Sequence, residues 1–449
     1  MLFRSIRPLR AGLALVVAGA IVVTLAAIVS GIVTRADARD DAQKTVPPAT
    51  AASSSAREIL DRARPSVVQI SGFFGTNTAE AFHGTAFAAA RGGIFITNWH
   101  VVSEAVLYPE KYRLEYKTAD GATGRITVRA IDVRHDLALV ETKGFAPAPL
   151  TLRPDPAIKG ERAYSIGFPL DVGLTITEGV SNGRVEDSFE SRIHYSGALN
   201  AGMSGGPGLD AAGRVIGVNV AGYWSSQLVA FLVPAERAIA LLAGAGAPAL
   251  DVTRARVEIA RQVTAHSDAL LAALGTTLPT QQHHGYDLPA KPAGFVDCHA
   301  AGDPASNHPL HVERVNCDAK SSLYVARDLQ SGGLRFEHQV LTAETLAAWR
   351  FASLLRQAAM PRPAYATERQ LAPFACTQDN VEVNGFAVNA IVCLRAYRKF
   401  DGLYDVHVHV VSKNQPRRGF VSSMTLTGVA ADRGLAFARV YLEALRSRR

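Results

Sequence analysis

Short β-type segments separated by turn residues occupy the chain from Ser66 to Pro234. The segments are rich in Val, Ile, Phe and Tyr, and Gly, Asp or Asn lies between them. They are SVVQISGFF (66–74), GIFITNWHVV (93–102), YRLEYKT (112–118), GRITVRAIDV (124–133), LALVET (137–142), RAYSIGFP (162–169), GRVIGVNVAGY (213–223) and LVAFLVP (228–234). Many short strands at this spacing predict an all-β barrel or sandwich for this part of the chain.

The pattern becomes helical after Pro234. Residues 235–242 predict a short apolar helix, and residues 251–274 predict a longer one that ends before Gly275. Residues 276–293 are rich in Pro, Gln and His, so we expect 246–293 to form a helical linker.

The last third, residues 294–449, combines β-type runs with helical segments and predicts an α+β domain. FVDC (295–298) with Cys317 is similar to FAC (374–376) with Cys393, and a predicted helix follows each set. We therefore interpret residues 294–360 and 373–449 as two copies of an internal duplication.

An apolar run without a charge covers residues 11–33, and three arginines precede it, Arg4, Arg7 and Arg10. A helix of this length spans roughly 35 Å, enough for a hydrocarbon core of about 30 Å. The positive-inside rule then predicts a cytoplasmic tail over 1–10 and export of everything after the helix. Ala36-Asp37-Ala38 has the form of a cleavage site, so a cleaved signal peptide is the alternative. The apolar run, however, is longer than the apolar region of an ordinary signal peptide. We expect a transmembrane signal anchor over 11–33 and a flexible tether over 34–55.

Ser204 lies in GMSGGP (202–207), a pattern that suits a nucleophilic serine. Glycines beside the serine let the backbone turn, so that the amides of Gly202 and Ser204 point together at a developing oxyanion. A serine hydroxyl also needs a neighbouring base, because it is unreactive at its own pKa.

Two further motifs supply a base for Ser204 and a carboxylate that orients this base. His100 lies in TNWHVV (97–102), which we expect at the end of a strand, and Asp136 lies in RHDLALV (134–140). Each residue alone has an ordinary structural explanation, as a core histidine, a strand-start cap or a turn serine. Together, in the order His, Asp, Ser with separations of 36 and 68 residues, they predict the catalytic triad His100, Asp136 and Ser204.

These motifs resemble those of trypsin-like serine proteases, particularly the HtrA (Deg) branch. Further similar segments are PSVVQI (65–70), GTAFAAARGG (84–93), SIGFPLDVGLTITEGVSNGRV (165–185) and FLVPAERAIALL (231–242). The resemblance covers residues 56–245 and implies a chymotrypsin-like double β-barrel, with the triad in the cleft between two six-stranded barrels. It implies no cofactor. The last third shows no carboxylate-binding loop of the PDZ type, so peptide capture by a PDZ domain is not implied.

The resemblance also implies a specificity pocket. Ala198 stands at the pocket base, where trypsin-type enzymes have an aspartate, and Leu199, Asn219 and Phe231 are candidate walls. An uncharged pocket predicts cleavage after a small or medium apolar residue such as Val, Ala or Leu.

The four cysteines are Cys298, Cys317, Cys376 and Cys393. Because the body of the protein is predicted to be exported, we expect disulfides, with Cys298–Cys317 and Cys376–Cys393 as the pairs. A zinc site is the alternative, since His299, His308 and His311 lie near Cys298, and His407 and His409 share one face of a strand. No Cys-x-x-Cys pair accompanies them, so we expect no metal.

Together these observations predict a membrane-anchored serine endopeptidase on the periplasmic side of the bacterial inner membrane. Its substrates would be exported proteins or peptides, in quality control or regulated proteolysis. We expect the C-terminal domain to bind a protein partner or to form a homo-oligomer. The net charge of +7 is not gathered into a basic stripe with aromatics, so no nucleic-acid partner is expected. The alternative is a catalytically silent scaffold that presents the C-terminal domain; the intact triad argues against it.

Overall fold

The structure is a computed structural model that describes residues 54–170, 172–222, 228–302, 308–358, 369–413 and 416–447. The predicted tail, anchor and most of the tether (residues 1–53) lie outside these ranges. Within them, no helix has both the length and the apolar character needed to cross a membrane. The last two residues of the predicted tether begin helix α1 (Ser54–Ala63), which a 3-10 turn (Arg64–Ser66) follows.

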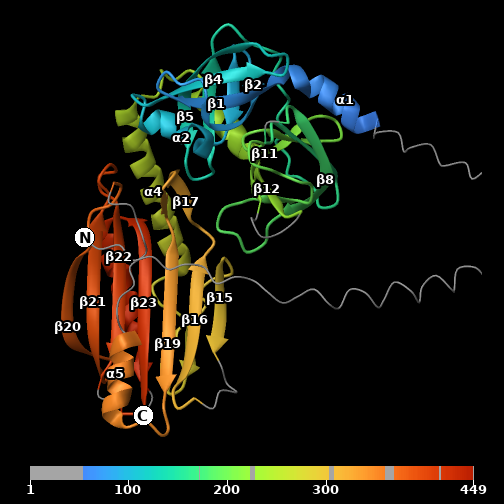
Figure 1. Ribbon diagram of the computed structural model, residues 1–449. Coiled ribbons are helices and arrows are strands. Elements are labelled where there is room, and N and C mark those ends of the chain that lie inside the picture. The colour runs from blue at the N-terminus through green and yellow to red at the C-terminus, as the bar shows by residue number, and fades with distance from the viewer. Residues whose placement is uncertain are drawn as a thin grey trace, which may run out of the picture. The chain divides into compact units, whose positions relative to one another are not determined.

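The first barrel is a closed sheet with the strand order β1-β2-β3-β6-β5-β4 (Figure 1). The strands are β1 (Val67–Phe74), β2 (Glu80–Ala90), β3 (Ile94–Thr97), β4 (Tyr112–Thr118), β5 (Thr123–Asp132) and β6 (Leu137–Thr142). Val68, Ile70 and Phe95 are fully buried inside it, as the strand pattern of the sequence predicts.

One predicted strand is wrong in its second half. The segment 93–102 leaves the sheet at Thr97, and helix α2 (Trp99–Leu107) follows. Trp99, Val102 and Val106 are buried at the spacing of a helix face, whereas the β-branched valines suggest a strand when the segment is considered alone.

The second barrel is also a closed six-stranded sheet, with the order β10-β11-β12-β9-β8-β7. Its strands are β7 (Arg162–Gly167), β8 (Thr175–Arg184), β9 (Ile193–Tyr195), β10 (Pro207–Asp210), β11 (Val215–Gly222) and β12 (Ala230–Pro234). Helix α3 (Ala235–Leu241) and a 3-10 turn (Leu242–Gly244) close this part of the chain. The predicted double-barrel fold is confirmed.

Helix α4 (Val252–Leu274) begins at Asp251, whose carboxylate accepts a hydrogen bond from the Arg254 amide at 2.8 Å. Ile259 and Val263 near its middle belong to the apolar core of the first barrel. Leu270 and Leu274 nearer its end belong to the core of the C-terminal sheet. The helix therefore packs into both cores.

Residues 276–293, predicted as part of a linker, instead form a hairpin of β13 (Thr280–His283) and β14 (Tyr286–Pro289). The hairpin pairs with β24 (Arg446–Ser447) near the end of the chain. Tyr286 and Leu288 are fully buried. All four residues of β14 are buried, and the Pro, Gln and His residues around them obscure the strand in the sequence.

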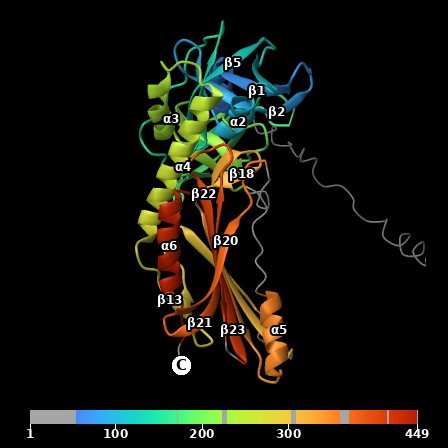
Figure 2. The same cartoon turned by 90° about the vertical axis from the view of Figure 1, so that its left-hand side faces the viewer.

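The C-terminal region forms a seven-stranded antiparallel sheet in the order β15-β16-β19-β23-β22-β21-β20. The strands are β15 (Val296–Gly302), β16 (His311–Ala319), β19 (Leu334–Thr342), β20 (Ala375–Val383), β21 (Phe386–Ala396), β22 (Tyr404–Ser412) and β23 (Arg418–Val429). Helix α6 (Ala431–Glu443) covers one face, and α5 (Ala348–Ala358) packs on the end of the opposite face (Figure 2). A two-stranded hairpin, β17 (Leu323–Ala326) and β18 (Leu329–Ser331), extends from the sheet.

Both edge hairpins of this sheet carry a disulfide between directly paired residues. Cys298 is bonded to Cys317 across β15 and β16, and Cys376 is bonded to Cys393 across β20 and β21. These are the two pairs that we expect from the sequence. The internal duplication stays a prediction.

Candidate active site

His100 is the second residue of α2, and the start of this helix is tied to the turn that carries Asp136. Asn98 Nδ2 donates to the carbonyl of Asp136 at 2.7 Å, and the Trp99 amide donates to the same oxygen at 3.2 Å. Thr97 is paired with Ala138 in the β3–β6 ladder, so the sheet brings the two segments side by side.

The carboxylate of Asp136 makes two hydrogen bonds to His100. Oδ1 accepts from the His100 amide at 2.9 Å, and Oδ2 lies 2.6 Å from His100 Nδ1. A proton on Nδ1 is required for this contact, so Nε2 of the neutral ring is left as the basic nitrogen. Asp136 is buried and has a positive φ of 60°.

The pKa of His100 lies above its ordinary value. Burial by itself lowers the pKa, and the charge and hydrogen bond of Asp136 more than offset that effect. The site therefore favours the imidazolium that forms when His100 accepts a proton.

Ser204 lies in the turn before β10, between two glycines with positive φ, Gly202 (95°) and Gly205 (84°). A Cβ atom at Gly202 would lie 2.2 Å from the carbonyl oxygen of Phe168, and one at Gly205 would lie 2.2 Å from that of Thr85. Only glycine fits both positions, because each needs a left-handed backbone and leaves no room for a side chain.

Thr85, on β2 of the first barrel, holds the Ser204 turn of the second barrel. Its amide donates to the Ser204 carbonyl at 2.8 Å, and its hydroxyl donates to the Gly202 carbonyl at 2.7 Å. Sequence reasoning did not single out this residue, although GTAF (84–87) lies in one of the segments that carry the resemblance.

The backbone hydrogen bonds around Ser204 determine which amides of this turn are free. The Ala201 carbonyl accepts a hydrogen bond from the Leu170 amide at 3.3 Å, so the trans peptide points the Gly202 N–H the opposite way. The Met203 amide is bound to the Asn200 carbonyl at 3.0 Å. Among the described residues, the amides of Gly202 and Ser204 have no acceptor, which leaves two donors for a substrate oxygen.

The hydroxyl of Ser204 donates to the Val220 carbonyl at 3.3 Å. No hydrogen bond joins it to His100 in the described part of the chain, although the triad prediction implies one. Rotation about the Cα–Cβ bond of Ser204 redirects its hydroxyl, and catalytic hydrogen bonds of this kind often form only when substrate is bound.

The predicted specificity pocket needs one correction. Asn219 is not an accessible wall: its side chain is 0% exposed. Its amide donates to the carbonyls of Ile166 and Met203, both at 3.2 Å, so it holds the turn that precedes Ser204. Ala198 is exposed, and Leu199 and Phe231 are half-buried.

A buried ionic cluster supports the Asp136 turn, and sequence reasoning missed it. Glu190, in the β8–β9 connection, accepts from Arg134 at 2.6 Å and lies 3.3 Å from His135 Nε2 and 3.0 Å from His266 Nδ1. Burial alone raises the pKa of Glu190, but the hydrogen bonds from His135, His266 and Arg134 hold it far below its ordinary range. The cluster joins both barrels to α4.

The same helix also holds the backbone before Asp136. Gln262, on α4, accepts from the Val133 amide at 2.6 Å and donates to the Ile131 carbonyl at 2.9 Å. Local motifs cannot reveal such contacts, because their partners are more than one hundred residues apart in the sequence.

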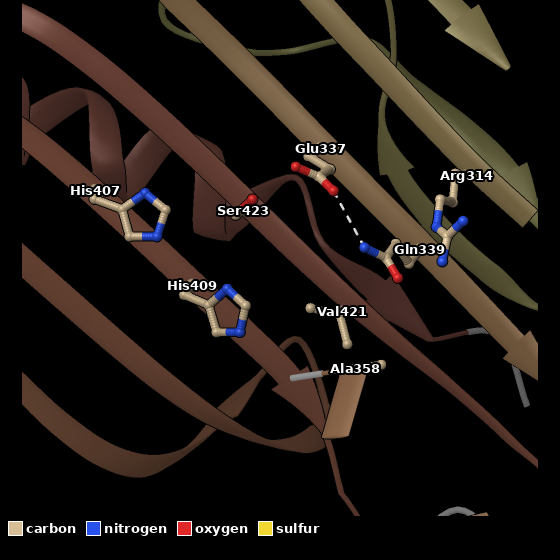
Figure 3. A pocket seen from close by; sticks show the side chains of 8 residues that line it. All are labelled: Arg314, Glu337, Gln339, Ala358, His407, His409, Val421 and Ser423. Carbon is tan, nitrogen blue, oxygen red and sulfur yellow. Dashed lines mark hydrogen bonds between the residues drawn. The ribbon is translucent and has the colours of Figure 1, made fainter. Parts of the chain in front are cut away.

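A cavity of about 350 Å³ lies elsewhere, on the face of the C-terminal sheet that α6 does not cover (Figure 3). Its lining residues are Arg314, Glu337, Gln339, Ala358, His407, His409, Val421 and Ser423. None of the triad residues lines it. In the part of the chain that the structure describes, no three His, Cys, Asp or Glu side chains are placed to hold a metal ion.

Comparison with known proteins finds similarity over part of the chain. Residues 84–218 match the trypsin-like peptidase domain. Serine protease HTRA1 of Xenopus tropicalis is 28% identical over 194 residues, which are 40% of each chain. A probable periplasmic serine endoprotease, DegP-like, of Chlamydia pneumoniae is 33% identical over 148 residues, covering 32% of this chain and 29% of the relative.

The active form of the Rv3671c protease from M. tuberculosis is a similar solved structure. It is 23% identical, with a TM-score of 0.38, and the match covers 42% of this chain and 85% of that one. This chain spans about two fifths of the length of the HTRA1 relative. The family match ends at residue 218, before the C-terminal sheet. The chain thus contains a trypsin-like peptidase domain over residues 84–218, with HtrA and DegP-like serine proteases among its relatives.

Proposed function

We propose that this chain is a serine endopeptidase in which Ser204 forms an acyl-enzyme with the substrate. The observation that carries the proposal is the 2.6 Å contact between Asp136 and His100. It is supported by the amides of Gly202 and Ser204, which have no acceptor among the described residues. An imidazole oriented by a carboxylate, with an oxyanion site beside the nucleophile, is the arrangement that acyl transfer requires.

In the first half of the reaction, Nε2 of His100 removes the proton of the Ser204 hydroxyl while the oxygen attacks the peptide carbonyl carbon. The amides of Gly202 and Ser204 donate hydrogen bonds to the resulting oxyanion. His100 then returns the proton to the leaving amine as the C–N bond breaks. In the second half, His100 takes a proton from a water molecule while the water oxygen attacks the acyl carbon. The bond between that carbon and Ser204 Oγ then breaks, and His100 returns the proton to Oγ as the acid leaves.

Asp136 stays ionised throughout. It holds the Nδ1–H tautomer of His100 and stabilises the imidazolium, in accord with the raised pKa of His100.

The substrate preference follows from the side chains near Ser204. No carboxylate occupies position 198, so a substrate Lys or Arg would find no partner at the pocket base. Ala198, Leu199 and Phe231 suit a small or medium apolar residue before the cleaved bond. We expect peptides ending in Val, Ala or Leu at that position to be cleaved faster than matched peptides with Arg.

We place the enzyme in the bacterial inner membrane, through a helix over 11–33, with its body on the periplasmic side. The apolar run with its preceding arginines supports this, as do two disulfides, which persist in oxidising compartments. On this proposal, a protease domain (56–245) and an α+β domain (294–449) are joined through 246–293. The substrates are exported proteins, in quality control or regulated proteolysis, and the C-terminal domain binds a protein partner or a second copy.

The proposal is tested by incubating the full chain with an unfolded protein substrate and comparing it with the Ser204→Ala variant. Loss of a triad serine lowers turnover by about 10⁶-fold, so only the unmodified chain should yield fragments. Equal cleavage by both chains, or no cleavage by either, would contradict an endopeptidase acting through Ser204.

One observation favours the second candidate function, a catalytically silent scaffold: the Ser204 hydroxyl donates to Val220 and not to His100. A scaffold would show no serine-dependent cleavage while retaining the fold, so the same experiment separates the two.

A further inference from the structure

The β17–β18 hairpin of the C-terminal region contacts the helix that carries His100. Leu323, Val325 and Leu329 of the hairpin belong to the same buried apolar cluster as Trp99 and Val102 of α2. Trp99 Nε1 also donates to the carbonyl of Val325 at 3.2 Å. The contact is therefore part of a shared core and contains a buried hydrogen bond.

Tyr324 is the hairpin residue that reaches the active site. Its ring meets the His100 imidazole edge-on, with 5.9 Å between ring centroids and 69° between ring planes. Its hydroxyl lies 3.5 Å from the Ser103 hydroxyl, one turn further along α2. The half-buried ring thus lies along the first turn of the helix.

We propose that Tyr324 is a positioning residue for His100, so that the C-terminal region completes the protease active site. The inference rests on the proposed function of the triad. It names a residue that lies more than one hundred residues beyond the matched peptidase domain.

The physical argument concerns the freedom of the imidazole ring. Asp136 holds the ring through Nδ1 only, and a single hydrogen bond leaves the ring free to tilt. The Tyr324 ring limits that tilt and removes water from one side of the imidazole. The aromatic ring supplies this effect, because the Tyr324 hydroxyl is directed at Ser103.

The size of the effect follows from what edge-on aromatic contacts contribute. Loss of such a contact should lower kcat/KM by about three- to tenfold, well short of the loss of a triad member. Tyr324→Phe keeps the ring and should retain nearly the full rate. Tyr324→Ala should show the loss.

A pH profile separates positioning from a general loss of structure. Burial lowers the pKa of His100, so hydrating the ring by Tyr324→Ala should raise that pKa. The charged groups around this site are Asp136 on the neighbouring turn, Glu104 on α2, Arg327 beside Tyr324, and Arg192 on the β8–β9 connection. None of them is altered in the variant, so the acidic limb of kcat/KM against pH should move to higher pH.

The experiment measures kcat/KM of the full-length chain and both variants on one apolar peptide substrate from pH 5 to 9. Thermal melts confirm that all three chains are folded. A slower Tyr324→Ala with a displaced acidic limb, and a Tyr324→Phe close to the unmodified chain, would support the proposal.

Three results would overturn it: equal rates for all three chains, a slower Tyr324→Ala with an unmoved acidic limb, or equal losses in both variants. Failure of the proposed function is distinguishable from these results, because the unmodified chain would then have no activity that Ser204→Ala abolishes.

Discussion

The two barrels and the C-terminal sheet are all antiparallel β-structures, yet their sequences differ in what they predict about function. In the barrels, the candidate catalytic residues His100, Asp136 and Ser204 lie in short motifs that follow or precede strands. In the C-terminal sheet, the sequence shows alternation and cysteine pairs, which specify buried faces and edges. The comparison teaches that short motifs point to candidate reacting groups, whereas residues that contact those groups can come from a region without any motif.

The pKa values of the histidines also differ between the barrels and the sheet. His100 and His135 of the first barrel lie next to carboxylates, and their pKa values are raised. His338 and His407 of the sheet are buried and hydrogen-bonded to hydroxyl groups, and burial lowers both pKa values to about 4. Charge is thus stabilised on the barrel histidines and opposed on those of the sheet.

The largest expected effect is a loss of catalysis by a first barrel that remains folded. Asp136→Asn should lower kcat by about 10⁴-fold, because the amide no longer holds the required tautomer of His100. Asparagine tolerates the positive φ of this position, so the melting temperature should change little. Steady-state kinetics and a thermal melt on the same sample check both parts. An unchanged kcat would remove Asp136 from the triad.

The next effect tests whether the Ser204 turn is as tightly packed as the structure shows. Gly205→Ala should lower the unfolding free energy by about 3–5 kcal/mol, since its Cβ would overlap the Thr85 carbonyl. Gly92→Ala is the matched control, because Gly92 has a similar φ of 82° but open space around it. Its loss should be about 1–2 kcal/mol, from backbone strain alone. Chemical denaturation of both variants measures the difference, and equal losses would refute the packing argument.

Removing one disulfide tests whether the sheet can lose stability while the barrels keep their activity. Replacing Cys298 and Cys317 by alanine should lower the stability of the sheet by about 3 kcal/mol, because the unfolded chain loses a cross-link. The Cys376–Cys393 disulfide closes a loop of similar length, so its replacement by two alanines should have a similar effect. Peptidase activity at 25 °C should persist in both. Complete loss of activity in a chain that remains folded would show a tighter coupling than we describe.

Through these histidines, acidification should lower the stability of the C-terminal sheet and raise that of the first barrel. A histidine with a lowered pKa stabilises the fold above its unfolded pKa of 6.5, and this contribution is lost as pH falls toward 4. Each of His338 and His407 should contribute on the order of 2–3 kcal/mol to that loss. The raised pKa values of His100 and His135 act the other way, since their contribution is present below 6.5 and is lost as pH rises.

Hydrogen exchange followed by peptide mapping at pH 7 and pH 5, corrected for intrinsic rates, resolves the two regions. Protection should fall first in β19 and β22, which carry His338 and His407. In His338→Gln the fall should be smaller, because one titrating group is gone. Earlier loss of protection in the first barrel would contradict the claim that His338 and His407 make the sheet the more acid-sensitive region.

Sequence reasoning reached the double barrel and the cysteine pairs, because each depends on local patterns or on a short recurring motif. The triad stays a prediction, and the structure brings two of its members, His100 and Asp136, into contact. It missed α2, where Val101 and Val102 suggest a strand until the burial of Trp99 and Val106 is known. It also missed the 280–289 hairpin, whose stability comes from Tyr286 and Leu288 packing against distant strands.

The supporting residues of the site were beyond prediction for the same reason. Glu190, Gln262 and Tyr324 act through partners far away in the sequence, so their roles appear only when the chain is folded. The resemblance to trypsin-like proteases implies a pocket wall at Asn219. Its complete burial and its two hydrogen bonds to backbone carbonyls give it a different role.

The central claim, that the geometry around Ser204 forms a working nucleophile, is tested most directly with a fluorophosphonate probe and peptide mass mapping. The full chain should gain one phosphonyl group on the peptide that contains Ser204, and His100→Ala should label far more slowly because the base is gone. Ser204→Ala should gain none. Labelling of Ser204→Ala equal to that of the unmodified chain, or no labelling of either, would contradict the account.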